Sequence, residues 1–226
     1  EGWLVDRVLD KAGQKGTGRW TAQVALDLAV PVPSIAAAID ARVLSSMKET
    51  RVAASSLLRG PDADAAPAPT PNFVSAVHDA LLASKLVAYA QGLALIRAAS
   101  DEHGWSVDPR EMARIWKGGC IIRARLLDTI MQAFDGPAQH ANLMLTAHFR
   151  EQLKTSRQAL QEVISLALQT GIPVPAMGAS LAYYDSYRSA ELPQNLTQAQ
   201  RDAFGAHTYQ RNDTEGSDFF HSDWLK

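Results

Sequence analysis

The segment FVSAVHDALLASKLVAYAQGLALIRAAS, residues 73–100, decides the fold class of this 226-residue chain. It contains no proline, and apolar side chains recur on nearly every face of a helix drawn through it. At 1.5 Å per residue, such a helix is about 40 Å long. A helix that is apolar all round is normally buried by other elements. We therefore predict a central helix that is wrapped by further helices.

A second long helical pattern runs from about residue 141 to residue 170. Shorter helical patterns cover residues 3–9, 20–28, 33–47, 109–116, 121–134, 176–190 and 193–205. Nowhere do apolar and polar residues alternate convincingly, as they do in a half-buried strand. The sequence thus predicts an all-α fold, in which residues 60–71, rich in proline, alanine and aspartate, form an exposed loop.

One short pattern occurs twice, as AL-x3-VPVP at residues 25–33 and as AL-x3-IPVP at residues 167–175. In both places a helix is expected to end, a Pro-x-Pro corner to follow and another helix to begin. Either the two corners acquired the same sequence pattern independently, or the domain consists of two duplicated halves. The second alternative predicts a pseudo-duplicated helical domain in which the long helices at 73–100 and 141–170 are equivalent.

The composition restricts the possible functions. Hydrophobic residues make up 46% of the chain, which is ample for a core, and the net charge is only −2. Such a balance predicts no general attraction to nucleic acid or to a membrane surface. The single cysteine, Cys120, cannot form an internal disulfide and indicates a cytoplasmic protein. The six histidines lack metal-ligand spacing, so we expect no metal site.

Three glycines in the segment GQKGTG, residues 13–18, make it a candidate anion site. Glycines let the backbone approach a ligand closely, while Lys15 adds a charge and Thr17 a hydroxyl. The spacing is not that of a P-loop, and no strand precedes the segment as in a dinucleotide-binding turn. The alternative is a flexible connection between helices, with its cations in solvent.

Arg42 is a second candidate, because it falls between Ile39 and Val43 near the apolar stripe of its expected helix. Either a buried carboxylate pairs with it or its guanidinium points into a cleft, and the sequence leaves both open. The C-terminal tail is a third. Arg201 and His207 flank a glycine there, and the aromatic content predicts that the tail docks on its own chain or on a second subunit.

Five motifs in order resemble the decarboxylating 6-phosphogluconate dehydrogenases. They are AGQKGTGRWT (12–21), ARVLSS (41–46), WKGGCIIR (116–123), LPQNLTQAQRD (192–202) and FGAHTY (204–209). The resemblance covers essentially the whole chain and concerns the helical C-terminal domain and tail of that family. It implies a substrate-binding and dimerisation domain at 1–205 and a tail at 206–226. We expect a fragment that lacks the family's N-terminal Rossmann domain for NADP.

The resemblance implies an enzyme of the pentose phosphate pathway that oxidises 6-phosphogluconate with NADP to ribulose 5-phosphate and carbon dioxide. In that family, the residues matching Lys15, Thr17 and Arg42 contact the substrate phosphate. Those matching Arg201 and His207 reach the partner's site in a homodimer, Arg201 toward the phosphate and His207 toward the sugar-acid chain. The family's general base and acid precede the matched region, so we expect no catalytic residue in this chain. Converging arginine and lysine donors independently suit a phosphate dianion.

Two alternatives remain open. The chain could serve only as a helical assembly module without a ligand of its own. It could also be the helical domain of a related dehydrogenase that acts on another hydroxyacid. Lys15 and Thr17 argue against this second alternative, because a substrate without a phosphate would not need such a loop.

Overall fold

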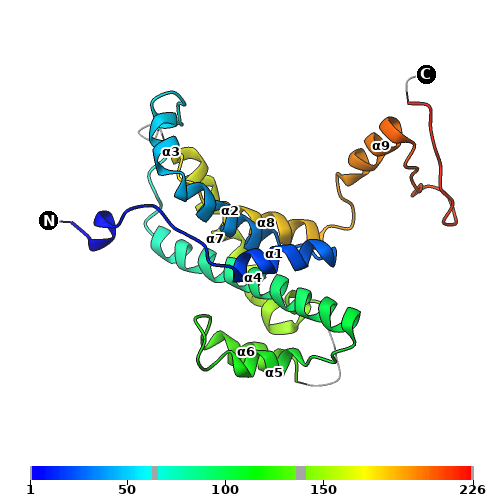
Figure 1. Ribbon diagram of the computed structural model, residues 1–226, viewed down its shortest axis with the longest axis horizontal. Helices are drawn as coiled ribbons and strands as arrows, with labels where there is room; N and C mark the ends of the chain where they lie inside the picture. Colours follow the sequence, from blue (N-terminus) through cyan, green and yellow to red (C-terminus); the bar gives the residue numbers. More distant parts are fainter. Residues whose placement is uncertain (1, 63–65, 136–140, 225–226) are drawn as a thin grey trace. The chain divides into compact units, whose positions relative to one another are not determined.

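The computed structural model describes residues 2–62, 66–135 and 141–224. Its α-helices are α1 (Thr17–Asp27), α2 (Pro33–Ser46), α3 (Lys48–Ser55), α4 (Phe73–His103), α5 (Pro109–Ile115), α6 (Leu126–Ala133), α7 (Ala147–Thr170), α8 (Pro175–Arg188) and α9 (Gln194–Gly205), with short 3-10 turns η1 (Leu4–Arg7) and η3 (Leu143–Leu145). Within the described ranges no strand forms, and the isolated bridge between Tyr209 and Phe220 is the β-type pairing found there. The all-α class is confirmed (Figure 1). Residues 63–65 of the expected loop lie outside the described residues.

The chain packs into two compact units, Glu1–Tyr184 and Asp185–Lys226. The first unit contains helices α1 to α7 and most of α8, and the second contains α9 and the tail. Within the second unit, α9 packs with the segment that follows it.

Helix α4 packs chiefly against α7, and the core of the first unit gathers around this pair, with further buried residues from α5, α6, η3 and α8. The buried residues of α7 recur every three or four positions, and they are Phe149, Leu153, Ser156, Leu160, Val163 and Ala167. Alanines 80, 83 and 90 are buried on α4, where small side chains allow close approach. By length and composition alone α4 could also cross a membrane, and its packing against α7 accounts for the same composition. The predicted central helix is confirmed.

The two Pro-x-Pro corners have the same backbone hydrogen bonds. Val30 N donates to Ala25 O at 2.8 Å, and Ile172 N donates to Ala167 O at 2.8 Å. These six-to-one bonds are typical of a helix that ends in a left-handed residue. The following helices, α2 and α8, each begin at a proline and each contain 14 residues.

The left-handed residue of each corner differs. Gly171 has φ +70°, and a Cβ at this position would also lie 3.0 Å from the Pro61 ring, so glycine is required there. The equivalent residue in the first corner is Ala29, with φ +53°. If the two corners are matched, α1 corresponds to α7 and α2 corresponds to α8. The corners therefore do not support the expected equivalence of the two long helices, α4 and α7.

A buried polar cluster fixes α2 against α4 and α8. Gln91 of α4 accepts a hydrogen bond from Ser34 N at 3.1 Å and donates one to Ser34 Oγ at 2.8 Å. Ser34 Oγ lies 2.8 Å from Ser180 Oγ, which itself donates to the Ala176 carbonyl at 2.7 Å. Because each polar group has a partner, this cluster holds the start of α2 in one position.

The prediction of a helix at residues 3–9 is wrong, since only the 3-10 turn η1 forms there. All residues of this stretch are exposed, Trp3 at 80%. So short a helix needs tertiary packing to be stable, and the described part of the chain supplies none over it. The pattern at 121–134 likewise becomes helical only from Leu126, after a turn in which Gly119 has φ +67°.

Candidate functional site

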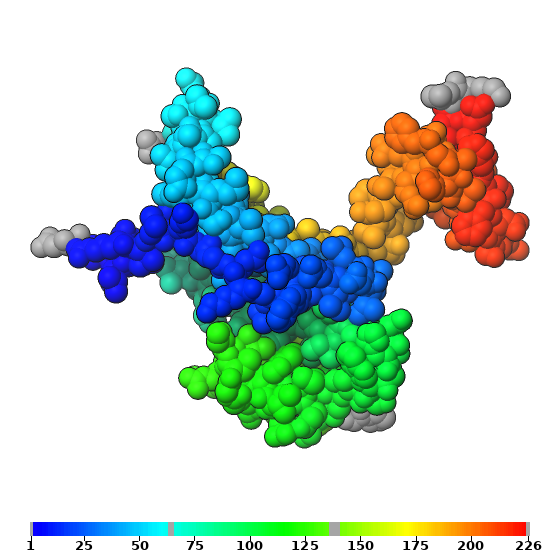
Figure 2. Space-filling view, viewed as in Figure 1, coloured from blue at the N-terminus to red at the C-terminus, as the bar shows by residue number. Residues whose placement is uncertain are grey.

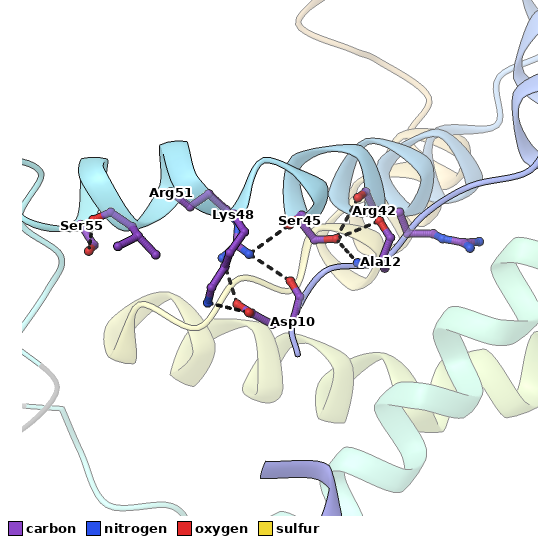
Figure 3. A network of polar contacts seen from close by, with 8 residues as sticks. Asp10, Ala12, Arg42, Ser45, Lys48, Arg51 and Ser55 are labelled. Atoms are coloured by element: carbon purple, nitrogen blue, oxygen red, sulfur yellow. Dashed lines mark hydrogen bonds and ion pairs between the residues drawn. The ribbon is translucent and has the colours of Figure 1, made fainter. Parts of the chain in front are cut away.

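The glycine-rich segment runs along the surface of α2 and is bonded to it by side chains (Figure 3). Ser45 Oγ accepts a hydrogen bond from Ala12 N at 2.9 Å, and the Arg42 guanidinium donates to the Gly13 carbonyl. In the space-filling view this N-terminal part of the chain lies on the surface of the first unit (Figure 2). The segment is therefore tied to α2 directly before it enters α1.

Gly18 is needed for close packing rather than for an unusual backbone conformation, whereas a side chain at Gly16 would make only an ordinary contact. A Cβ on Gly18 would lie 3.1 Å from Ile39 Cγ1, so glycine lets α1 approach α2 closely. A Cβ on Gly16 would touch the Trp20 ring at 3.4 Å. None of the three glycines of the loop has a positive φ. Gly18 thus brings the start of α1 close to α2, the helix that carries Arg42.

Lys15 and Thr17 lie at the end of this loop, where α1 begins. Both side chains are exposed, and Thr17 is the first residue of α1. The N-cap, Gly16, provides no side chain to accept from the first backbone N–H groups of the helix. These N–H groups carry the positive end of the helix dipole and favour an anion. Among the described residues, Lys15 has no ion-pair partner.

Arg42 is exposed and pairs with the loop, not with a carboxylate. The alternative of a buried carboxylate partner, left open by the sequence, is therefore wrong. Position 42 lies on the solvent side of α2, beside the loop, because α2 is only partly covered. Only one nitrogen, Nη2, binds Gly13, which leaves other N–H groups of the guanidinium to bind a ligand. This arrangement brings the second cation of the predicted site to the loop that carries Lys15.

Asp10 anchors the start of the loop through two cations. Its carboxylate accepts from Lys48 Nζ at 2.6 Å and from Arg51 Nη1 at 3.0 Å. These hydrogen bonds, that from Lys48 first, lower the pKa of Asp10 to about 2. The carboxylate is therefore ionised throughout the neutral range, and the two cations on α3 are occupied.

In the second unit, Arg201 and His207 line one pocket of about 340 Å³. Both side chains are exposed, and Arg201 Nη1 donates to Gln198 Oε1 at 3.0 Å. A Cβ on Gly205 would lie 3.1 Å from the His207 ring, so the glycine makes room for the imidazole. The sequence-predicted residues of the tail are thus brought together, as those of the loop are in the first unit.

Asp202 is the centre of this second unit and is fully buried. Its carboxylate accepts four hydrogen bonds, from Thr208 N (2.9 Å), Ser222 N (3.0 Å), Trp224 Nε1 (2.8 Å) and His221 Nδ1 (3.0 Å). Burial raises the pKa of this carboxyl, yet the four donors outweigh burial and hold the pKa well below its usual value. One ionised side chain therefore orders the tail on both sides of its turn.

A larger pocket of about 570 Å³ lies between α1, α2, α4 and residues 116–122. Most of its lining is apolar, with Lys85 and Tyr89 among the polar residues. The Tyr89 hydroxyl donates to the Ile122 carbonyl at 2.7 Å, and burial raises the pKa of this tyrosine. A dianion needs several converging donors, so the loop surface suits it better than this pocket.

Comparison with known proteins decides the family. The sequence pattern of the family described as "6-phosphogluconate dehydrogenase, C-terminal domain" matches residues 1–224. The chain belongs to the 6-phosphogluconate dehydrogenase family.

Relatives of this family are similar to the chain over nearly its whole length. A decarboxylating 6-phosphogluconate dehydrogenase of Synechocystis is 54% identical over 99% of the chain, which covers 46% of that relative. An NADP(+)-dependent, decarboxylating 6-phosphogluconate dehydrogenase of Bacillus subtilis is 52% identical over 99% of the chain and is covered to 47%. The chain thus spans about half the length of the curated relatives it matches.

A solved structure has the same fold. The Plasmodium falciparum 6-phosphogluconate dehydrogenase superposes with a TM-score of 0.91 at 41% identity, over 98% of this chain and 47% of that one. That protein is described in its apo form, with its cofactor NADP+ and with its substrate 6-phosphogluconate. At this identity the likeness extends beyond the fold to the family's helical domain.

Sequence reasoning found the exposed cations of the site but missed the residues that hold them. Ser45 and Asp202 lie within the five motifs of the sequence analysis, but no role was assigned to them. Asp10 and Arg51 lie outside these motifs. Their side-chain partners are 19 to 41 residues away, and their other partners are main-chain groups, so no local spacing could reveal them. The one available signal was the pair of serines three and four residues after Arg42, at a helix end where side chains often bond to the backbone.

Proposed function

We propose that this chain is the substrate-binding and dimerisation part of a decarboxylating 6-phosphogluconate dehydrogenase. The enzyme would convert 6-phosphogluconate and NADP+ into ribulose 5-phosphate, carbon dioxide and NADPH, a reaction of the pentose phosphate pathway. Membership of the family and the whole-length similarity to decarboxylating relatives support this proposal. A cytoplasmic location agrees with the single cysteine, Cys120.

The observation that carries the proposal is the pairing of Arg42 with the loop of Lys15. The guanidinium bonds to Gly13, two residues before Lys15, and the uncapped start of α1 follows directly after this lysine. A phosphate dianion there would accept from the guanidinium, the ammonium and the Thr17 hydroxyl. Binding the phosphate at this end orients the sugar acid and leaves its hydroxyl and carboxylate for groups outside this chain.

We further propose a homodimer in which the tail of one subunit completes the site of the other. Arg201 would then add a third cation to the phosphate, and His207 would bind the sugar-acid chain. Exposed apolar side chains support a partner on the second unit, since Phe204 is 89% exposed and Phe219 is 69% exposed. The self-contained folding of this unit around Asp202 also suits a module that docks on another subunit.

The described residues do not fit a binding site for NADP. They form no strand, and the glycine-rich loop enters α1 from an irregular segment, so the strand–turn–helix that holds a dinucleotide is not formed by them. NADP would supply the hydride acceptor, and we assign its binding to the part of the enzyme that this chain does not span.

The test is the Michaelis constant for 6-phosphogluconate in the full-length enzyme. Replacing Arg42 or Arg201 with alanine should raise this constant on the order of 10² to 10³-fold, because a charge-assisted bond to the phosphate is lost. The KM for NADP should stay unchanged. Lys154→Ala is the matched control, because this exposed lysine lies on α7 and, among the described residues, pairs with Glu151 at 3.7 Å. An unchanged constant in both arginine variants would contradict the proposal.

A further inference from the structure

The backbone of the glycine-rich loop is held by side chains at three positions. The carbonyl of Asp10 accepts from Arg51 Nη2 at 2.9 Å, and the N–H of Ala12 donates to Ser45 Oγ at 2.9 Å (Figure 3). The carbonyl of Gly13 accepts from Arg42. All three side chains come from α2 and α3. These bonds therefore fix the position of the loop relative to α2 and α3 immediately before Lys15.

The hydroxyl of Ser45 links the loop to the backbone of α2. Its proton goes to the Arg42 carbonyl at 2.8 Å, since the alternative acceptor, the Ala12 carbonyl, is 3.4 Å away. Its lone pair is thus free to accept from Ala12 N–H. This hydroxyl therefore joins the residue that carries the guanidinium to the loop that carries the ammonium.

Arg51 links the same elements from the other side. Its Nη2 donates both to the Asp10 carbonyl and to the Ser45 carbonyl at 3.0 Å, while its Nη1 binds the Asp10 carboxylate at 3.0 Å. The Ser45 carbonyl lies in the last turn of α2, where a backbone acceptor lacks a helical partner. The planar guanidinium can make all these bonds at once, which an ammonium cannot.

The far end of the loop is also fixed. Gly18 lies against Ile39, and α1 begins at Thr17. Only residues 14–16 lie between this point and the bonds at Gly13, so the position of Lys15 has little freedom. A loop fixed at both ends loses less entropy when it binds a ligand than a free loop does.

We propose that Ser45, together with Asp10 and Arg51, positions Lys15 and Thr17 beside Arg42 for binding the substrate phosphate. These three are positioning residues, because each acts through the loop backbone and none is assigned to the ligand. The inference rests on the proposed function, since it assumes that the phosphate binds at this loop.

The test is the Ser45→Ala variant of the full-length enzyme. Losing the acceptor of Ala12 N–H should raise the KM for 6-phosphogluconate about 3- to 10-fold, and the inhibition constant of inorganic phosphate by the same factor. The KM for NADP and the melting temperature should stay close to the parent values. Ser46→Ala is the matched control, because the Ser46 hydroxyl bonds to Val43 O of its own helix and its loss should change neither constant.

Two further variants separate positioning from a general loss of structure. Ser45→Thr keeps the hydroxyl and should restore both constants to within about twofold of the parent. Arg51→Lys keeps the charge but loses the bridging guanidinium, and should raise both constants as Ser45→Ala does. A double variant of Ser45→Ala with Lys15→Ala should show less than the sum of the two single effects, since Ser45 acts through the loop that carries Lys15.

The outcomes distinguish this inference from the proposed function. If Arg42→Ala raises the KM for 6-phosphogluconate and Ser45→Ala does not, the positioning role is overturned and the phosphate site stands. If neither Arg42→Ala nor Arg201→Ala has an effect, the proposed phosphate site is overturned and the inference with it. If Ser45→Ala raises the KM for NADP equally, the serine has a general structural role and the inference is wrong.

Discussion

The loop on α2 and the tail around Asp202 both present candidate binding residues, but they are held by different means. The loop is fixed by several partly exposed side chains, among them Asp10, whose side chain is 56% exposed. The tail is fixed by one carboxylate that is fully buried and accepts four hydrogen bonds. When several contacts hold a segment, the loss of one weakens its order only in part. When one buried group holds a segment, the loss of that group removes the order of the whole segment.

The difference also suits the two proposed roles. The loop belongs to the larger unit, where the buried contact of Ser34 with Gln91 already fixes α2. The tail unit is small, with few buried residues, and its order depends on a polar centre more than on apolar burial. Both arrangements place cations at the surface without requiring their burial.

The largest effect is expected for Asp202→Asn. An amide offers one acceptor oxygen and adds two donors that face the existing donors, so the tail should lose its order. With Arg201 and His207 both displaced, kcat/KM for 6-phosphogluconate should fall at least about 10³-fold. Hydrogen exchange of residues 206–224 should become fast in the same variant.

Asp213→Asn is the control for this prediction. Asp213 is exposed and, among the described residues, pairs with Arg211 in the same unit. Its replacement should leave both the exchange rates and the kinetics unchanged. Parent-like protection of the tail in Asp202→Asn would show that the carboxylate is not its organising centre.

A smaller effect is expected for Gly205→Ala. The added Cβ would lie 3.1 Å from the His207 ring and should push the imidazole out of its position while the tail stays folded. We expect a rise of about fivefold in the KM for 6-phosphogluconate, the loss of one hydrogen bond. Gly178→Ala is the control, because a Cβ added to Gly178 would meet no described atom within 4 Å. Equal kinetics in the two variants would remove His207 from the site.

The smallest effect is expected from salt. In 1 M KCl the Debye length falls to about 3 Å, which weakens the exposed ion pairs of Asp10 more than the buried bonds of Asp202. Exchange of the Ala12 amide should become about two to five times faster, while the amides of Thr208 and Ser222 should change less than about twofold. Equal acceleration of all three amides would contradict the distinction between the two regions.

The pH dependence follows from the same carboxylates. The pKa of Asp10 is lowered to about 2, so its stabilising contribution is complete above the ordinary value of 3.8 and is lost as the pH falls between these values. The lowered pKa of Asp202 acts in the same direction. Protection of both regions should thus be constant from about pH 5 to 8, as hydrogen exchange corrected for intrinsic rates would show.

The sequence predicted the helices that have strong local signals. The apolar segment at 73–100 gave α4, and the Pro-x-Pro corners gave the starts of α2 and α8 at Pro33 and Pro175. It failed at residues 3–9, where the helical spacing was present but no other described element covers the apolar side chains. Periodicity reports what a segment can form, and packing decides whether it does.

The cations of the candidate site could be predicted from the sequence, but the residues that hold them in place could not. Lys15, Thr17 and Arg42 stood in recognisable motifs, and the structure brings Arg42 to the loop of the other two. The exposure of Arg42 and the burial of Asp202 were not predictable, because both depend on contacts between distant segments. A carboxylate in a sequence carries no sign that four donors will surround it.

The central claim is that the loop of one subunit and the tail of another bind the same phosphate ester. It is tested most directly by mixing two variants of the whole enzyme, each with an impaired site, under conditions of subunit exchange and at a substrate concentration where neither variant alone is active. One enzyme carries Arg42→Ala, and the other ends before Arg201. Each mixed dimer would contain one site with an intact loop and an intact tail.

Random exchange makes half of the dimers mixed, each with one of two sites intact, so activity should recover to roughly a quarter of the parent value. Native mass spectrometry would verify that mixed dimers form. Recovery to this level would support a shared site. Mixed dimers that remain inactive would contradict it, because the loop and the tail would then have to act within the same chain.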